Sequence, residues 1–130
     1  FIYLFEGAGL VHTRVVELRK AMLDRGDQLV TSALTLGEIL VKPIEANNAE
    51  LAAKYEKAVS TTSLIVAFDA RVAKVYARLR CDRSIRAPDA IQLACAATAS
   101  VDLFITNDEH LAGKRVEGIQ FIVPLSRVPL

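Results

Sequence analysis

The chain has 130 residues, about the size of one domain, with 52% hydrophobic and 24% charged residues, and this composition excludes an intrinsically disordered protein. Sixteen Lys and Arg against fifteen Asp and Glu give a net charge of +1. That balance excludes a uniformly basic nucleic-acid-binding surface, although it allows a local basic patch.

The cysteines and the longest apolar runs indicate the compartment. Cys81 and Cys95 form neither a CxxC motif nor a secreted-type disulfide framework, which favours a reducing environment. No apolar run reaches the roughly 18 residues that a membrane span requires. We therefore expect a cytoplasmic protein that does not associate with a membrane.

Short apolar runs alternate with segments in which hydrophobic residues recur at helical spacing. The first run, Phe1-Ile2-Tyr3-Leu4-Phe5, resembles the end of a buried strand, so we expect the beginning of that strand to be missing upstream. Gly26 is placed to end a helix, Pro43 to stop one, and Pro88 to begin one. The pattern predicts helices over residues 11–25, 34–41, 49–59, 72–79, 88–99 and 109–111, and later strands over residues 29–32, 63–68, 101–105 and 119–123.

The predicted strands are nearly continuous apolar runs separated by helices. This pattern is typical of a parallel sheet that is covered on both faces, because such strands are buried from both sides. We find no internal repeat or linker and expect one α/β domain over residues 1–130. In doubly wound sheets, ligands bind beyond the carboxyl ends of the strands, so the residues after each strand are the candidates for function.

Three acidic residues occupy such positions or the start of a neighbouring helix. Glu38 follows the second strand, Asp89 begins the helix before the fourth strand, and Asp108 directly follows that strand. Each also has a purely structural interpretation. Thr35-x-x-Glu38 fits a helix capping box, Asp89 suits the positive end of a helix dipole, and Asp108 suits a helix cap.

The functional interpretation depends on the three acids meeting in one crevice. Clustered carboxylates repel one another unless a cation or a shared proton compensates their charge. A site with only oxygen ligands suits Mg²⁺ or Mn²⁺ rather than zinc. Such an ion can lower the pKa of a bound water molecule and offset negative charge on a phosphate.

Four segments together resemble the PIN-domain ribonucleases, and within these the VapC toxins of bacterial toxin–antitoxin pairs. They match in order and spacing over almost the whole chain: Tyr3-Leu4-Phe5-Glu6-Gly7, Thr31-Ser32-Ala33-Leu34-Thr35-Leu36-Gly37-Glu38, Arg86-Ala87-Pro88-Asp89-Ala90-Ile91-Gln92-Leu93-Ala94 and Phe104-Ile105-Thr106-Asn107-Asp108. The resemblance implies a three-layer PIN-like domain, in which helices cover both faces of a central parallel sheet of four to five strands.

The same resemblance implies a metal-dependent endoribonuclease that leaves 5′-phosphate and 3′-hydroxyl ends. Glu38, Asp89 and Asp108 would form the acidic pocket that binds Mg²⁺ or Mn²⁺, and Thr106 would be its polar helper. The implied partners are an RNA substrate, a second copy of the chain in a homodimer, and a cognate antitoxin whose tail fills the acidic crevice.

One departure from the family pattern leaves an alternative open. The first aspartate of the family lies just before a segment like Phe1-Ile2-Tyr3, and the sequence begins after that position. A non-catalytic PIN-fold module that binds RNA or protein, or a fragment that is inactive without this aspartate, is the alternative. A phospho-acceptor receiver domain with Asp69 as acceptor is disfavoured, because Glu6 and Lys114 supply its other required groups poorly. Asp69 also follows a predicted strand, where it fits the N-cap of the next helix.

A cluster of positive charge precedes Asp89. Six cations fall within sixteen residues and are opposed only by Asp82, so the local excess is five: Arg71, Lys74, Arg78, Arg80, Arg83 and Arg86. An ordinary solvated helix face is one interpretation. The other is a strip that binds RNA phosphates through counterion release, with Arg86 and Arg83 closest to Asp89 along the chain.

Overall fold

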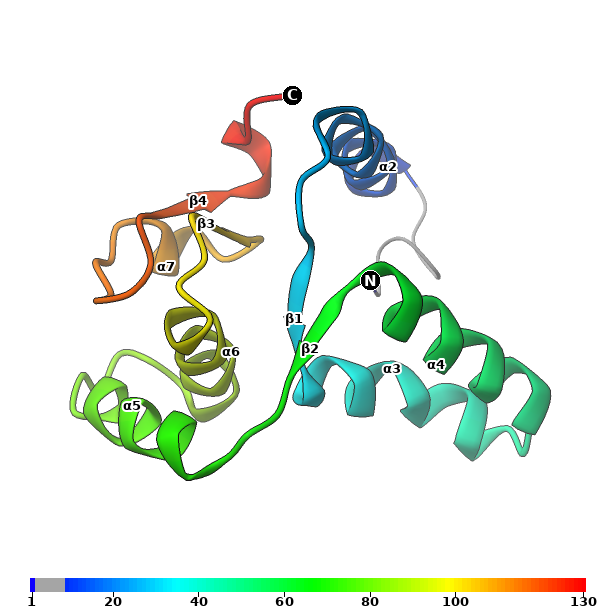
Figure 1. Cartoon of the computed structure of the whole chain (residues 1–130), viewed down its shortest axis with the longest axis horizontal. Coiled ribbons are helices and arrows are strands. Elements are labelled where there is room, and N and C mark those ends of the chain that lie inside the picture. Colours follow the sequence, from blue (N-terminus) through cyan, green and yellow to red (C-terminus); the bar gives the residue numbers. More distant parts are fainter. Residues whose placement is uncertain (2–8) are drawn as a thin grey trace.

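The computed structural model describes Phe1 and residues 9–130. Within these residues the chain alternates helices with short strands (Figure 1). The elements in chain order are α2 (Gly9–Arg25), β1 (Val30–Ser32), α3 (Ala33–Glu45), α4 (Ala49–Thr62), β2 (Leu64–Val66), α5 (Ala70–Arg80), α6 (Ala87–Thr98), β3 (Leu103–Thr106), α7 (Glu109–Ala112), β4 (Phe121–Pro124) and the 3-10 helix η1 (Leu125–Arg127).

The described strands form two parallel pairs. β1 pairs with β2, with Thr31 opposite Ile65, and β3 pairs with β4, with Phe104 opposite Ile122. The predicted α/β class and parallel pairing are confirmed. The expected sheet of four to five strands appears as two two-stranded sheets, because no described strand is hydrogen-bonded to both pairs. The strand predicted at the start of the chain lies outside the described residues, apart from Phe1.

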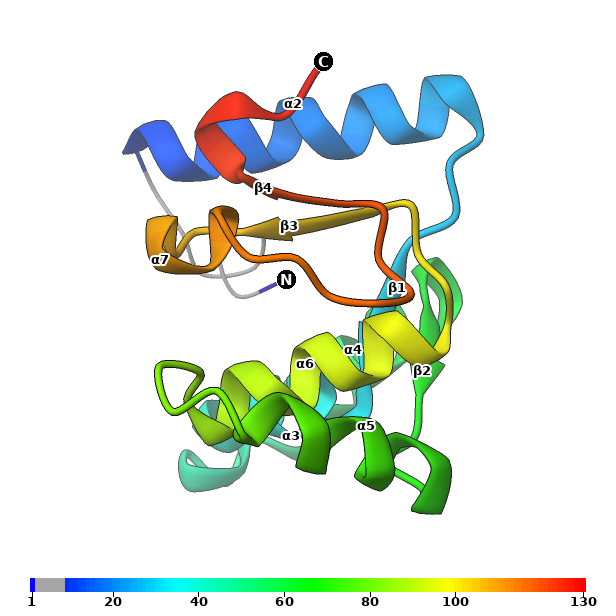
Figure 2. The same cartoon turned by 90° about the vertical axis from the view of Figure 1, so that its left-hand side faces the viewer.

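Helices cover both faces of the β3–β4 pair, as predicted. Successive side chains of a strand point to opposite faces of a sheet. Phe104 packs against the cluster around Leu93 of α6, whereas Ile105 packs against the cluster that contains Leu18 of α2. Figure 2 shows β3 and β4 between α2 and α6. This part of the molecule therefore has the three layers that the sequence predicts.

The core of the domain centres on α6. Ala90, Leu93 and Ala94 of this helix are fully buried, and Cys95 is almost fully buried. Val72 of α5 packs against Ala94 and Cys95, so α5 covers one side of the helix. Burial raises the pKa of the Cys95 thiol, because the charged thiolate is poorly solvated there. The first turn of α6 carries the half-buried Asp89 at the edge of this core.

Several predicted helix ends are confirmed. Gly26 follows α2 with φ of 74°, a conformation that glycine adopts without a Cβ clash. Asp69 is the N-cap of α5, and its Oδ1 accepts the N–H of Val72 at 2.9 Å. Pro88 lies in the first turn of α6, where a missing N–H costs nothing.

The predicted stop before Pro43 is wrong, because α3 continues through this residue to Glu45. Pro43 removes one helical donor, but its own carbonyl accepts the N–H of Asn48 at 2.8 Å after the helix ends. Its ring is almost fully buried. Packing of the ring, so close to the end of the helix, thus outweighs the lost hydrogen bond.

None of the helices in the described part of the chain is both long enough and apolar enough to cross a lipid bilayer.

Candidate functional site

A ring of three hydrogen-bonded side chains joins the end of β1 and the start of α3 to α6. The Oγ of Ser32 donates to Oε1 of Gln92 at 2.7 Å, and Nε2 of Gln92 donates to Oγ1 of Thr35 at 2.9 Å. The backbone N–H of Thr35 closes the ring by donating to Ser32 Oγ at 3.3 Å. We call this cluster the polar ring. It fixes the carboxyl end of β1 against α6.

Burial makes the polar ring energetically important. The exposed fraction of Ser32 is 1%, and it is the one polar residue in the described ranges that is classed as buried. A buried hydroxyl without a partner costs about 1–3 kcal/mol, so the amide of Gln92 satisfies a group that water cannot reach. No local pattern predicts this contact, because Ser32 and Gln92 are 60 residues apart.

Glu38 lies one helical turn beyond the polar ring. Ser32, rather than Thr35, is the N-cap of α3, and its side chain accepts the N–H of Thr35. The capping box that would have occupied Glu38 is therefore not formed. Glu38 is exposed in the middle of α3, three residues after Thr35 and near the same helix face.

Asp89 lies one turn before the polar ring on α6. It is half-buried in the first turn of that helix, three residues before Gln92 and so near the same face. A carboxylate is favoured there by the helix dipole. Glu38 and Asp89 are thus each one helical turn from the same hydrogen-bonded cluster, although they come from different helices.

Asp108 and Thr106 form a separate local arrangement at the end of β3. The Oγ1 of Thr106 accepts the backbone N–H of Asp108 at 3.0 Å, and Oδ1 of Asp108 accepts the N–H of His110 at 2.9 Å. Asp108 is exposed and is the N-cap of α7. The cap uses one carboxylate oxygen of Asp108, and the hydrogen bond to Thr106 holds the backbone of that residue.

The described residues do not bring the three acids together as a metal-binding group. Across Phe1 and residues 9–130, no set of three or more His, Cys, Asp or Glu side chains is arranged to hold an ion. The donor chemistry of Glu38, Asp89 and Asp108 does suit Mg²⁺ or Mn²⁺, since all three supply carboxylate oxygens. Their meeting in one pocket stays a prediction.

The basic side chains that precede Asp89 differ in their surroundings. The guanidinium of Arg80 donates to the carbonyl of Ile85 at 2.6 Å, so it supports the loop between α5 and α6. Arg83 and Arg86 are exposed on that loop, and Arg86 is the N-cap residue of α6 without a capping hydrogen bond from its side chain. A role of these two arginines in binding RNA phosphates stays a prediction.

The acid within this basic cluster has its own partner. Lys114 Nζ lies 3.0 Å from Asp82 Oδ2 and 2.8 Å from the hydroxyl of Ser84. The Ser84 hydroxyl, then Lys114 and the Ser84 N–H, lower the pKa of Asp82 to about 2. Asp82 therefore compensates the positive charge of Lys114 rather than that of the neighbouring arginines.

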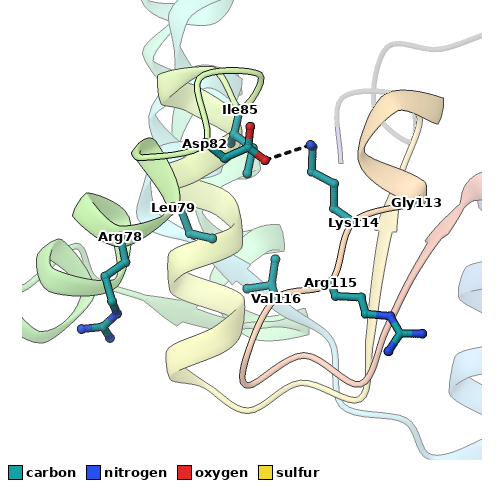
Figure 3. Close-up of a pocket in the computed structure, with 8 residues that line it drawn as sticks. All are labelled: Arg78, Leu79, Asp82, Ile85, Gly113, Lys114, Arg115 and Val116. Carbon is teal, nitrogen blue, oxygen red and sulfur yellow. Dashed lines mark hydrogen bonds and ion pairs between the residues drawn. The ribbon is translucent and has the colours of Figure 1, made fainter.

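This ion pair borders a cavity of about 370 Å³ between the end of α5 and residues 113–116. In Figure 3, Lys114 reaches toward Asp82, whereas Arg78 and Arg115 point away from each other. None of the predicted acids lines the cavity. Its polar groups hold two segments together, and it is not the candidate site.

Comparison with known proteins gives one match. A family model described as PIN domain matches residues 1–116. Neither the curated proteins nor the solved structures contain a match to the chain. PIN domains are typically nucleases, and in general they use divalent metal ions. The matched range includes all three residues of the polar ring and every predicted acid. We conclude that the chain belongs to the PIN domain family.

Proposed function

We propose that the protein is a metal-dependent endoribonuclease and the toxin of a VapC-type toxin–antitoxin pair. The observation that carries the proposal is the PIN-domain match over residues 1–116, which contains the four proposed site residues. The arrangement around the polar ring supports it, because Glu38 and Asp89 each lie one turn from that cluster. The third acid, Asp108, follows β3, where the family pattern also has an acid.

The proposed roles follow from the chemistry of each side chain. Glu38, Asp89 and Asp108 supply the carboxylate oxygens that hold Mg²⁺ or Mn²⁺. The ion, when bound, supplies positive charge that activates water and stabilises the phosphate during cleavage. Thr106 acts through Asp108, because its hydroxyl accepts the N–H of that residue and so fixes the turn that carries the carboxylate. The products are 5′-phosphate and 3′-hydroxyl ends.

Arg83 and Arg86 bind the RNA substrate in this proposal. Both are exposed on the loop that leads into α6, and Arg86 is three residues before Asp89. Guanidinium groups form strong, often bidentate, hydrogen bonds with phosphate. Contacts of this kind position the backbone of the RNA without reading its sequence.

The cellular setting is also part of the proposal. The four matching segments are most similar to the VapC toxins, which supports a homodimer that a cognate antitoxin silences. We also propose a cytoplasmic location, where the RNA substrate is found. The order of the matched segments supports this setting. The antitoxin is tested by asking whether the protein encoded beside the gene binds the nuclease and stops RNA cleavage.

Cleavage of RNA by the full-length protein tests the activity. A 5′-labelled single-stranded RNA is incubated with Mn²⁺, with Mg²⁺ or with EDTA. We expect cleavage with the ions, none with EDTA, and a loss of at least about 100-fold for Asp89→Asn. Asp24→Asn is the matched control, because Asp24 is exposed on α2 and has no role in the proposal.

Two outcomes would contradict the proposal. Equal cleavage by the wild type and Asp89→Asn would remove Asp89 from the site. RNA binding without cleavage under any ion condition would assign the protein to the alternative, a non-catalytic PIN-fold binding module.

A further inference from the structure

Helix α5 has two chemically distinct faces. Val72 is fully buried against α6, and Val75, Tyr76 and Leu79 pack on the same side. The outward side carries Arg71, Lys74 and Arg78, which are all exposed. Their spacing of three and four residues aligns them along one strip of the helix surface. We call these three residues the basic stripe.

Among the residues that the structure describes, no acidic side chain pairs with the basic stripe. Helix α5 contains no Asp or Glu. The acid just before it, Asp69, uses its side chain to cap the helix, and the acid just after it, Asp82, is paired with Lys114. Within the described residues, no side chain of the basic stripe forms an ion pair or a hydrogen bond. Three adjacent cations without partners repel one another, and a polyanion relieves that repulsion.

The spacing of the basic stripe fits a nucleic-acid backbone. Arg71 and Arg78 are seven residues apart, which is about 10 Å along a helix axis. Three cations spread over this length can each contact a separate phosphate of one RNA strand. The end of α5 leads directly into the loop with Arg83 and Arg86, and then into Asp89. A backbone that follows these cations is guided toward the proposed site.

We propose that the outward face of α5 is a second RNA-binding surface, on which Arg71, Lys74 and Arg78 bind phosphates outside the cleavage site. The stripe carries no aromatic side chain for stacking on bases, so this surface recognises the backbone and not the sequence. The inference rests on the proposed function for the identity of its ligand. Its test measures binding rather than cleavage, so the two can fail separately.

Salt-dependent RNA binding tests the basic stripe. Binding of a fluorescein-labelled single-stranded RNA to the full-length protein is measured by anisotropy in EDTA, between about 50 and 200 mM salt. One variant combines Arg71→Gln, Lys74→Gln and Arg78→Gln. The matched control combines Lys20→Gln, Lys54→Gln and Lys57→Gln, which removes the same charge from exposed positions on α2 and α4.

We expect the stripe variant to bind at least about tenfold more weakly at the lowest salt. Its slope of log K against log salt should be shallower by about 2, because each phosphate contact on a single strand contributes about 0.7 to the slope. The control variant should keep the wild-type slope. Unchanged circular dichroism and thermal unfolding of both variants establish that the substitutions leave the fold intact.

Equal changes in the two variants would overturn the inference, because net charge alone would then explain them. An unchanged slope in the stripe variant, or no RNA binding by the wild type, would also overturn it. Cleavage that depends on Asp89 but not on the basic stripe would support the proposed function and reject this second surface. A slope of log K against log salt that depends on the basic stripe, without any cleavage, would support the surface and reject the proposed function.

Discussion

Replacing Gln92 by Leu should expose the energetic importance of the polar ring. The substitution replaces the amide by an apolar side chain of similar size on α6, and so removes the acceptor of the Ser32 hydroxyl and the donor to Thr35. Ser32 is only 1% exposed, so water cannot replace the lost partner. An unsatisfied buried hydroxyl costs about 1–3 kcal/mol, and the half-buried Thr35 adds a smaller loss. We expect a decrease of about 2–3 kcal/mol in the free energy of unfolding.

Urea denaturation of the wild type, Gln92→Leu, Ser32→Ala and the double variant measures this effect. Ser32→Ala also loses the N-cap of α3, which costs about 1 kcal/mol. In the double variant the buried Ser32 hydroxyl is itself absent and no longer needs an acceptor, so Gln92→Leu should cost clearly less there than in the wild type. Gln120→Leu is the control, because Gln120 is exposed. A cost below about 0.5 kcal/mol for Gln92→Leu, or strictly additive costs, would show that the hydrogen bond between Ser32 and Gln92 contributes little to stability.

Two further predictions concern other parts of the molecule. Gly118→Ala should lower the free energy of unfolding by about 1–3 kcal/mol in urea denaturation, because a Cβ there would lie 2.6 Å from the carbonyl oxygen of Ala97 and φ is +94°. Asp82 should titrate near pH 2 in an NMR experiment, since Ser84 and Lys114 lower its pKa to about 2. A pKa that is depressed by folding stabilises the folded state above the unfolded value of about 4, and the contribution is lost as the pH falls through about 2.

Each of these has a control. Gly37→Ala on α3 meets no atom within 4 Å, so it should leave stability unchanged or raise it. If Gly118→Ala is equally well tolerated, the close approach to Ala97 is not a constraint. Lys114→Ala should shift the NMR titration of Asp82 upward, and an unchanged titration would show that the ammonium group does not contribute.

Much of the fold could be predicted because its signals are local. Helical spacing located the helices, and Asp69 and Pro88 marked two of their starts. Even so, the strands are shorter than their apolar runs: residues 63–68 contain only the three-residue strand Leu64–Val66. Hydrophobic character identifies a buried run, but the length of a strand depends on which neighbour is available for pairing.

The features that the sequence could not predict depend on contacts between distant residues. The partner of Ser32 is 60 positions away, and nothing in the local pattern of either segment shows the pairing. Pro43 remains inside α3 because its ring is buried, which is a tertiary effect. For the candidate site, residue type and position after a strand selected Glu38, Asp89 and Asp108. Whether they meet depends on how β3 is placed relative to the polar ring, which no short motif encodes.

Residue-by-residue detection of Mn²⁺ binding by NMR tests whether Glu38, Asp89 and Asp108 share one metal site. Paramagnetic Mn²⁺ broadens the NMR signals of nearby nuclei, so a titration of the ¹⁵N-labelled full-length protein reports where the ion binds. We predict that the amide signals of Glu38, Asp89 and Asp108 broaden together below one equivalent, and that Asp89→Asn abolishes the broadening at all three. Broadening at only one of them, or at unrelated surface acids such as Asp24, would contradict a shared metal site.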